Sequence, residues 1–277
     1  MMETCLQHRL TARERELFER DGYLVVEDAL PAAMVKDLVA LADDIDAEGR
    51  RKAGAGTERM NHYDVIGRDP RLLQLLDWPT TFAKVWGILG WNIQLYHTHL
   101  TVNPMEPAGD DPKGDGLNLS WHQDSGQLNA DLETSPRPRI SLKVGYFLTD
   151  TSETGRGNLY VLPGSHLHDA FPGDDRRALP DGAVAVQVPA GTAVIFDRRI
   201  WHSGSDNHWR EPRRVLFYGY SYRWLRPRDD MDVAHYLPDC DPIRRQLLGR
   251  SVTGGRGYTS PTEDDTPLKA WIEAAAR

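Results

Sequence analysis

Hydrophobic residues recur every three or four positions through most of the first ninety residues, a spacing that predicts amphipathic helices. The clearest helix spans 32–47, where one face would be formed by Val35, Leu38, Leu41, Ala42 and Ile45. An earlier helix is predicted to begin at Thr11, because Glu14 three residues later completes a capping box. A third amphipathic segment, over 71–90, is interrupted at Trp78-Pro79 and therefore predicts two shorter helices.

Short hydrophobic runs separated by turn residues replace this pattern from residue 91 onward. The predicted strands are Ile93–Val102, Ile140–Leu148, Leu159–Leu162, Ala183–Val188, Ala193–Phe196 and Val215–Tyr222, and a strand at Tyr23–Val26 precedes them. Strands this short predict an antiparallel sandwich or barrel. Two long loops, 104–120 and 125–139, are candidates for a lid or for binding loops. The tail beyond Arg226 is polar, with one predicted helix from Pro267 to Ala275.

The composition is that of an ordinary soluble globular protein, with 40% hydrophobic and 27% charged residues. We expect a single domain over 1–277, with a helix-rich part (1–90), a β core (91–225) and a C-terminal extension (226–277). A net charge of −8 argues against a nucleic-acid partner. The two distant cysteines, Cys5 and Cys240, and the lack of an apolar run long enough to span a membrane predict a cytoplasmic protein. Both a monomer and a homodimer are compatible with the sequence.

Three side chains of the types that bind transition metals are candidates for one site. His122 and Asp124 are two residues apart, so on an extended chain both point to the same side and can bind one ion. His202, which follows the predicted strand Ala193–Phe196, is the candidate for a third ligand. Two histidines and one carboxylate leave coordination positions open, which is typical of iron(II) oxygenases and differs from closed zinc sites.

The His-x-Asp spacing carries little weight alone, because a chain with 10 histidines is expected to contain it by chance. His62-Tyr63-Asp64 has the same spacing. That segment lies in the helix-rich part, beside a glycine-rich loop, with no predicted strand neighbours to supply a third ligand. We therefore interpret His62 as a surface or helix-packing histidine.

Two adjacent arginines come before the strand Val215–Tyr222, and the first of them, Arg213, is eleven residues after His202. Arg213 and Arg214 would lie on opposite faces of the strand, so one of them is expected to face the interior. A buried unpaired charge is costly, and a guanidinium binds a carboxylate through two parallel hydrogen bonds. A dicarboxylate ligand would satisfy the buried arginine, and a solvated basic run is equally compatible with the spacing.

Four short motifs follow one another along the chain. They are Trp121-His122-Gln123-Asp124, Gly157-Asn158-Leu159-Tyr160-Val161-Leu162-Pro163-Gly164-Ser165-His166, Trp201-His202-Ser203-Gly204 and Pro212-Arg213-Arg214. In order and separation they resemble the phytanoyl-CoA dioxygenase (PhyH) family of iron(II)- and 2-oxoglutarate-dependent oxygenases. The likeness covers roughly residues 10–225.

The resemblance implies a mainly β fold, with a double-stranded β-helix (jelly-roll, cupin-like) core and flanking α-helices. It also implies iron(II), 2-oxoglutarate as co-substrate, and O2. Matched position by position, His122, Asp124 and His202 are implied as iron ligands, and Arg213 as the residue that binds the far carboxylate of 2-oxoglutarate. Related halogenating enzymes have a small residue in place of Asp124, so hydroxylation is favoured over halogenation.

Further pocket residues are implied by the same resemblance. The strand that contains His97, His99 and Thr101 matches a pocket-lining strand, which implies that Thr101 lies near the co-substrate and that the histidines lie near it or the substrate. Tyr146 matches an aromatic residue beside 2-oxoglutarate.

Gly204 is a departure from the family pattern, because some members have a polar residue there that helps to hold 2-oxoglutarate. Ser203 and Ser205 are candidate replacements.

The predicted activity is hydroxylation of an unactivated C–H bond in a small metabolite or natural-product intermediate, with release of succinate and CO2. The tryptophans near the motifs, Trp121, Trp201 and Trp209, would suit stacking against a substrate ring. Desaturation, cyclisation and epimerisation stay open, because each also begins with removal of a substrate hydrogen. The alternatives from other classes are a metal-dependent hydrolase and a catalytically silent jelly-roll binding module.

Overall fold

The computed structural model describes residues 2–106 and 117–275. Most of the loop 104–120, predicted as a lid, lies outside the described residues. The helices are α1 (Met2–Cys5), α2 (Ala12–Asp21), α3 (Ala32–Ala53), α4 (Pro70–Leu75), α5 (Pro79–Leu89), α6 (Gly126–Asp131), α7 (Pro242–Leu247), α8 (Arg256–Thr259) and α9 (Pro267–Ala275). The strands are β1 (Tyr23–Val26), β2 (Met60–Tyr63), β3 (Ile93–Asn103), β4 (Ser141–Phe147), β5 (Leu159–Val161), β6 (Val184–Val186), β7 (Ala193–Asp197), β8 (His202–Gly204) and β9 (Arg213–Tyr222).

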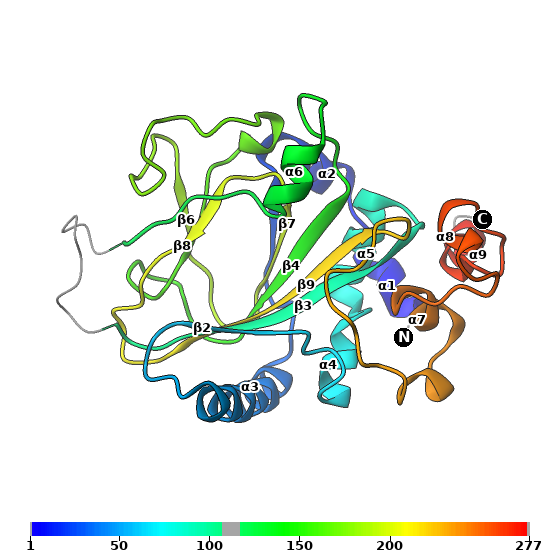
Figure 1. Cartoon of the computed structure of the whole chain (residues 1–277), viewed down its shortest axis with the longest axis horizontal. Helices are drawn as coiled ribbons and strands as arrows, with labels where there is room; N and C mark the ends of the chain where they lie inside the picture. Colours follow the sequence, from blue (N-terminus) through cyan, green and yellow to red (C-terminus); the bar gives the residue numbers. More distant parts are fainter. Residues whose placement is uncertain (1, 107–116, 276–277) are drawn as a thin grey trace.

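Two antiparallel sheets form the jelly-roll core (Figure 1). The major sheet has the strand order β1-β7-β4-β9-β3-β2, and the minor sheet has the order β6-β5-β8. An isolated bridge between His122 and His202 extends the minor sheet beyond β8. The mainly β, jelly-roll prediction is therefore confirmed.

Hydrophobic side chains fill both sides of the major sheet. Between the sheets lie Phe147, Leu159, Val161, Val186, Val188, Val194, Phe196, Ile200, Val215 and Phe217. On the other face of the major sheet a larger core joins strand side chains to the helices, as in the contact of Phe82 of α5 with Tyr220 of β9. Helix α5 lies on the side of β4 and β9 away from the minor sheet, whereas α3 packs near β2 (Figure 1). The helices therefore cover one face of the major sheet, and its other face is turned toward the minor sheet.

Most of the predicted elements are present, and the capping box at Thr11 and Glu14 is formed. The hydrophobic pattern failed to predict two short strands, β2 and β8, because neither has hydrophobic alternation. Helix α3 continues to Ala53, past the predicted end at residue 47, because the charged residues after it extend its solvent-facing side. The predicted helix Pro267–Ala275 is α9, and the polar tail also contains α7 and α8.

The C-terminal extension is attached to the helical side of the molecule. Arg244 of α7 forms an ion pair with Asp77 at 2.9 Å between Nη2 and Oδ1, and the Asp77 side chain is fully buried. Gln246, also on α7, donates hydrogen bonds to the carbonyl oxygens of Trp91 and Ile93 at the start of β3. These contacts hold the segment after β9 next to the end of the major sheet.

The structure also describes the two cysteines and the hydrophobicity of the helices. Cys5 and Cys240 are both buried, and within the described residues neither forms a disulfide. Among the described residues, no helix combines the length and the hydrophobicity that crossing a membrane would require.

Strand β4 is buried on both faces, and its alternation decides which residues face the site. Lys143 and Phe147 point between the sheets, whereas Tyr146 points to the helices. The hydroxyl of Tyr146 lies 2.6 Å from Oγ1 of Thr81 on α5, and it donates to the carbonyl of Leu75 at 3.3 Å. The prediction that Tyr146 lies beside 2-oxoglutarate is wrong, because Tyr146 is three positions after the inward-facing Lys143 and therefore lies on the opposite face of the strand.

We expect Tyr146→Phe to lower the free energy of unfolding by about 1 kcal/mol, because a buried hydroxyl pair loses one partner. Binding of ligands in the pocket should not change. Urea unfolding and a titration with 2-oxoglutarate would measure the two effects. Tyr63→Phe, at a ring that is 60% exposed, is the control and should change stability by less than about 0.5 kcal/mol. A loss of ligand affinity without a loss of stability in Tyr146→Phe would contradict this assignment.

Candidate metal centre and its pocket

Two backbone segments meet as a single antiparallel bridge that positions the candidate ligands. The N–H of His122 donates to the carbonyl of His202 and the N–H of His202 donates to that of His122, both at 3.0 Å. The N–H of Asp124 donates to the carbonyl of Arg198, also at 3.0 Å. The extended backbone between His122 and Asp124 places both side chains on the side of His202, as the spacing predicted.

The three side chains form a group that could hold a metal ion, with one ligand atom from each lying within 4.8 Å of the others. The Nδ1 atoms of His122 and His202 donate to the carbonyls of Ser120 and Ile200, each at 2.9 Å. A carbonyl oxygen can only accept, so the proton of each neutral ring is on Nδ1 and the lone pair is on Nε2. The Nε2 atom of His202 lies 4.0 Å from Oδ1 of Asp124. Ring orientation and tautomer therefore both fit a metal between these atoms.

The charge states also suit metal binding at neutral pH. Burial, and then the neighbouring His122, lowers the pKa of His202 to about 3 although Asp124 opposes the shift, so the imidazole is neutral. Burial alone would raise the pKa of Asp124, but the Lys143 ammonium and the two histidines hold it well below the usual range. No proton has to leave His202 or Asp124 before a cation binds.

Lys143 lines the pocket and contacts a candidate metal ligand, although the sequence analysis did not predict it as a site residue. Its Nζ lies 2.7 Å from Oδ2 of Asp124, and its side chain is only 10% exposed. The ammonium also lies over the rings of Phe196 and Phe217, at 5.7 and 5.6 Å from their centroids. A lysine inside the hydrophobic run Ile140–Leu148 was the available signal, since a buried lysine needs an anionic partner.

The competing His-x-Asp pair does not form a site. Nε2 of His62 lies 2.8 Å from Oδ1 of Asp46 on α3, and the imidazole packs against Gly49. Asp64 instead accepts a hydrogen bond from the N–H of Met231 at 3.0 Å. His62 is therefore a helix-packing residue, as predicted. The expectation that it has no strand neighbours is wrong, because β2 pairs with β3.

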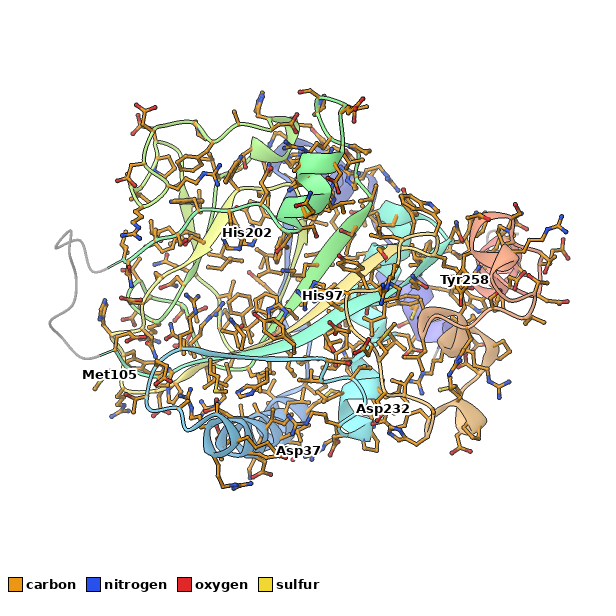
Figure 2. All side chains as sticks on the ribbon, viewed as in Figure 1. Asp37, His97, Met105, His202, Asp232 and Tyr258 are labelled. Atoms are coloured by element: carbon orange, nitrogen blue, oxygen red, sulfur yellow. The ribbon has the colours of Figure 1, made fainter. Side chains whose placement is uncertain are left out.

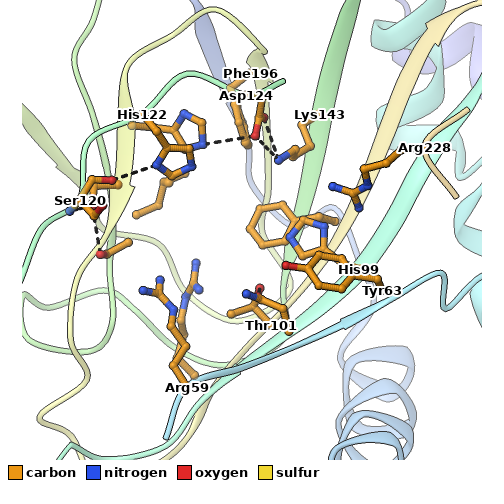
Figure 3. Close-up of a pocket in the computed structure, with 17 residues that line it drawn as sticks. Arg59, Tyr63, His99, Thr101, Ser120, His122, Asp124, Lys143, Phe196 and Arg228 are labelled. Atoms are coloured by element: carbon orange, nitrogen blue, oxygen red, sulfur yellow. Dashed lines mark hydrogen bonds and ion pairs between the residues drawn. The ribbon is translucent and has the colours of Figure 1, made fainter. Parts of the chain in front are cut away.

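A pocket of about 310 Å³ opens beside the three ligands (Figure 3). It is lined by Arg59, Asn61, Tyr63, His99, Thr101, Ser120, His122, Asp124, Lys143, Leu159, Phe196, His202, Ser203, Gly204, Arg213, Phe217 and Arg228. Among these described residues Asp124 is the only carboxylate, against four cationic side chains. The pocket is thus locally positive in a chain whose net charge is −8.

Arg213 enters this pocket as the inward-facing member of the arginine pair. The residue is 3% exposed, its Nε has no hydrogen-bond partner among the described residues, and its Cζ lies 5.5 Å from the centroid of Phe147. Burial, and then the charge of Arg59, lowers the pKa of Arg213 to about 9, so at neutral pH it is still charged. Arg214 points away and forms an ion pair with Asp43 at 2.7 Å. A buried guanidinium without an acidic partner fits an anionic ligand.

The residues expected on β3 are arranged as their alternation predicts. His99 and Thr101 line the pocket, but the Thr101 hydroxyl already donates to Oδ1 of Asn61 at 2.7 Å. His99 stacks on Phe217 with ring centroids 4.6 Å apart, and His97 stacks behind it at 5.4 Å. Burial, and then the charge of Lys143, lowers the pKa of both histidines well below the usual value. His97 does not line the pocket, although both His97 and His202 lie in the interior of the molecule (Figure 2).

The tryptophans adjacent in sequence to His122 and His202 point away from the pocket, so they cannot stack on a substrate bound there. Trp121 and Trp201 are adjacent in sequence to His122 and His202, so their side chains point to the opposite face of the minor sheet. There they pack with Leu119, Tyr160 and Leu162 in a separate core. Trp209 lies instead against Arg156, 4.3 Å from its Cζ. The prediction that these three rings stack on substrate is not supported.

Other lining residues come from segments that the sequence gave no reason to select. Arg59, Asn61 and Tyr63 belong to β2 or directly precede it, and Arg228 follows the last strand of the major sheet. Arg228 lies over the Tyr63 ring at 5.1 Å and 3.3 Å from Oδ1 of Asp229. The residues at β2 reach the pocket because β2 pairs with β3, and Arg228 reaches it because its N–H donates to the carbonyl of Tyr96 on β3 at 2.9 Å. No local sequence pattern predicts either of these long-range contacts.

We expect the protein to bind one divalent metal ion per chain, and His122→Ala to weaken that binding at least about a hundredfold, because a direct ligand is lost. Calorimetric titration of the metal-free protein with Co(II) would measure this. His62→Ala should bind the ion normally and instead lower the free energy of unfolding by about 1–3 kcal/mol, since Asp46 loses one of its two partners and keeps only Arg50. If His62→Ala abolished metal binding and His122→Ala did not, the assigned site would be wrong.

Comparison with known proteins agrees with this geometry. The sequence model of the Phytanoyl-CoA dioxygenase (PhyH) family matches residues 18–215. The uncharacterized protein Rv1501 of Mycobacterium tuberculosis is 27% identical over 258 residues, which cover 87% of this chain and 89% of the relative. The ectoine dioxygenase of Stutzerimonas stutzeri is 25% identical over 261 residues, which cover 82% and 79%.

The same fold occurs in the epimerase SnoN, whose crystal structure contains Fe3+, alpha ketoglutarate and nogalamycin RO. The two structures superpose with a TM-score of 0.59 and 23% identity, over 81% of this chain and 87% of SnoN. The family match covers well over half of the sequence and includes all three candidate ligands. The protein therefore belongs to the phytanoyl-CoA dioxygenase (PhyH) family.

Proposed function

We propose that the protein is an iron(II)- and 2-oxoglutarate-dependent dioxygenase that hydroxylates an unactivated C–H bond of a small metabolite or natural-product intermediate. The observation that carries this proposal is the presence, in one pocket, of a His-Asp-His ligand set and a buried guanidinium that lacks an acidic partner. The family to which the chain belongs supports the same reaction class.

His122, Asp124 and His202 would hold iron(II). Their oxygen and imidazole donors suit this ion, and three protein ligands leave positions for a co-substrate and O2. Bound iron, with 2-oxoglutarate and O2, supplies the oxidising power that removes a hydrogen from the substrate, while 2-oxoglutarate is converted to succinate and CO2. Lys143 keeps Asp124 ionised and restricts its rotation, because it contacts both carboxylate oxygens.

Arg213 would bind the far carboxylate of 2-oxoglutarate. Arg213 is the first residue of β9 and pairs with Asn103 at the end of β3, so the major sheet fixes the position of its backbone. A bidentate pair with the carboxylate would satisfy the Nε atom that has no partner in the described part of the chain. Thr101 and His99 lie on the adjacent wall, where they would contact the co-substrate or the substrate.

Apolar side chains close the pocket around the reacting atoms. Leu159, Phe196 and Phe217 line it from strands of both sheets, and each is almost completely buried. By reducing contact with water they would protect the reactive centre and strengthen the electrostatic contacts within it. The loop 125–139, part of which forms α6, stays a candidate lid, with Arg137 tied to the carbonyl of Asn129 at 2.7 Å.

A small substrate is favoured because a pocket of about 310 Å³ is at the lower end of the range for ligand sites, about 300–1,000 Å³. Hydroxylation is the reaction we favour, by analogy with the ectoine dioxygenase relatives. The structural relative SnoN is an epimerase, so epimerisation, like cyclisation or desaturation, is the alternative within the same chemistry.

Arg213→Ala is expected to weaken 2-oxoglutarate binding by about 10- to 100-fold, because the far carboxylate would lose its charged partner. Arg214→Ala is the matched control, since its side chain binds Asp43 outside the pocket. Anaerobic titration of the iron(II) protein, monitored by the visible metal-to-ligand charge-transfer band, would give both dissociation constants. Equal effects of the two substitutions would argue against the assigned role of Arg213, and the lack of any band in the unsubstituted protein would argue against the proposed function.

Substrate-dependent release of succinate is expected when the correct small molecule is found in a metabolite screen. The product of the hydroxylation reaction should carry one oxygen atom from 18O2, as measured by mass spectrometry. A product that has lost two hydrogens or inverted a stereocentre without gaining 18O would instead identify a desaturase, a cyclase or an epimerase. The same screen with His122→Ala is the control, and this variant should release no succinate.

A further inference from the structure

Arg59 is a second guanidinium in the pocket, and it reaches the space beside Gly204. Arg59 immediately precedes β2, on the opposite wall from β8, and its side chain points into the cavity (Figure 3). A Cβ atom placed on Gly204 would lie 1.9 Å from Nη2 of Arg59 and 3.1 Å from its Cζ. These distances are far inside van der Waals contact, so Arg59 can occupy this position only because residue 204 has no side chain.

Arg59 and Arg213 lie close enough to influence each other. The charge of Arg59 contributes to the lowered pKa of Arg213, after the larger effect of burial. Within the described residues, Nε of the buried Arg213 has no hydrogen-bond partner, and Arg59, an exposed residue, forms no ion pair with a carboxylate. Asp206 and Glu106 act on Arg59 only through longer-range attraction. Two cations that line one pocket repel each other, and an anion bound between them would relieve this repulsion.

The hydroxyl groups next to Gly204 are already engaged. Oγ of Ser203 accepts a hydrogen bond from the N–H of Ser120 at 2.8 Å and donates to the carbonyl of Gly204 at 3.2 Å. Oγ of Ser205 donates to the carbonyl of Asp206 at 3.2 Å, and Ser205 does not line the pocket. Neither Ser203 nor Ser205 therefore replaces a polar side chain at 204, contrary to the expectation from the sequence.

We propose that Arg59 and Arg213 together bind the far carboxylate of 2-oxoglutarate, and that Gly204 is required because it leaves room for Arg59. The inference rests on the proposed function and adds a residue to it. A carboxylate has enough lone pairs to accept hydrogen bonds from two guanidinium groups, and it neutralises the repulsion between them. The guanidinium of Arg59 thus occupies the space that a side chain at position 204 of β8 would fill, although Arg59 comes from the opposite wall of the pocket.

The first test compares 2-oxoglutarate binding by the unsubstituted protein, Arg59→Ala and Arg51→Ala. Arg51 is an exposed residue of α3 and serves as the matched control. We expect Arg59→Ala to raise the dissociation constant by about 10- to 100-fold and Arg51→Ala to leave it unchanged. Anaerobic calorimetry on the iron(II) protein gives the constants without any need for turnover, and thermal unfolding shows whether each variant is folded.

The second test is a rescue experiment at Gly204. In the unsubstituted protein, Gly204→Ser should weaken 2-oxoglutarate binding by about tenfold or more, because the new side chain displaces Arg59. In the Arg59→Ala background the same change should strengthen binding, because a serine hydroxyl then has room to donate to the carboxylate. The sign of the Gly204→Ser effect is thus expected to reverse between the two backgrounds.

The possible results separate this inference from the proposed function. If the unsubstituted protein binds 2-oxoglutarate and Arg213→Ala weakens binding, but Arg59→Ala does not, the role of Arg59 is refuted and the proposed function stands. An effect of Gly204→Ser with the same sign and size in both backgrounds would refute it equally. If the unsubstituted iron(II) protein does not bind 2-oxoglutarate, both the proposed function and this inference fail.

Discussion

The pair of reciprocal backbone hydrogen bonds between His122 and His202 is the constraint on which the site depends. It joins two segments eighty residues apart and fixes them directly opposite each other, so that alternation along each chain decides what meets at the centre. The Nδ1 atoms then bind carbonyls of Ser120 and Ile200 in the same two segments. One short ladder therefore determines the position, orientation and tautomer of both imidazoles, and only the carboxylate of Asp124 needs a separate restraint, which Lys143 provides.

The pocket is positively charged, although the whole chain has a net charge of −8. Lys143 is neutralised locally by Asp124, whereas Arg213 has no acidic partner in the described structure and is surrounded by apolar groups such as Phe147. Burial of such a group costs free energy, and the cost is recovered only when an anion binds. The unpaired charge of Arg213 is therefore the group through which this pocket would favour an anionic ligand.

The sequence predicted the barrel well because its strands have strong local signals, but it predicted the pocket unevenly. His122, Asp124 and His202 could be selected from residue type and spacing together with family motifs. Strand alternation predicted that either Arg213 or Arg214 faces the interior, and the family resemblance selected Arg213. Tyr146 was misplaced, because both faces of β4 are buried and each contains hydrophobic residues, so hydrophobicity alone does not show which face points into the pocket. Lys143 on the same strand was overlooked although its charge marked the inward face. Arg59 and Arg228 come from segments without periodic patterns, and only the tertiary fold brings them to the site.

Some residues that line the pocket come from segments outside the bridge that positions the metal ligands. The family match ends at residue 215, yet Arg228 beyond it reaches the pocket and lies over Tyr63 from β2. Strand β2 is an edge strand of the major sheet and pairs with β3, and the segment after β9 is held by contacts such as Arg244 with Asp77. Both can vary in sequence while the bridge at His122 and His202 is retained, because neither contributes to that bridge. The core of the jelly roll therefore holds the three candidate metal ligands, and residues from these two peripheral segments line the pocket beside them.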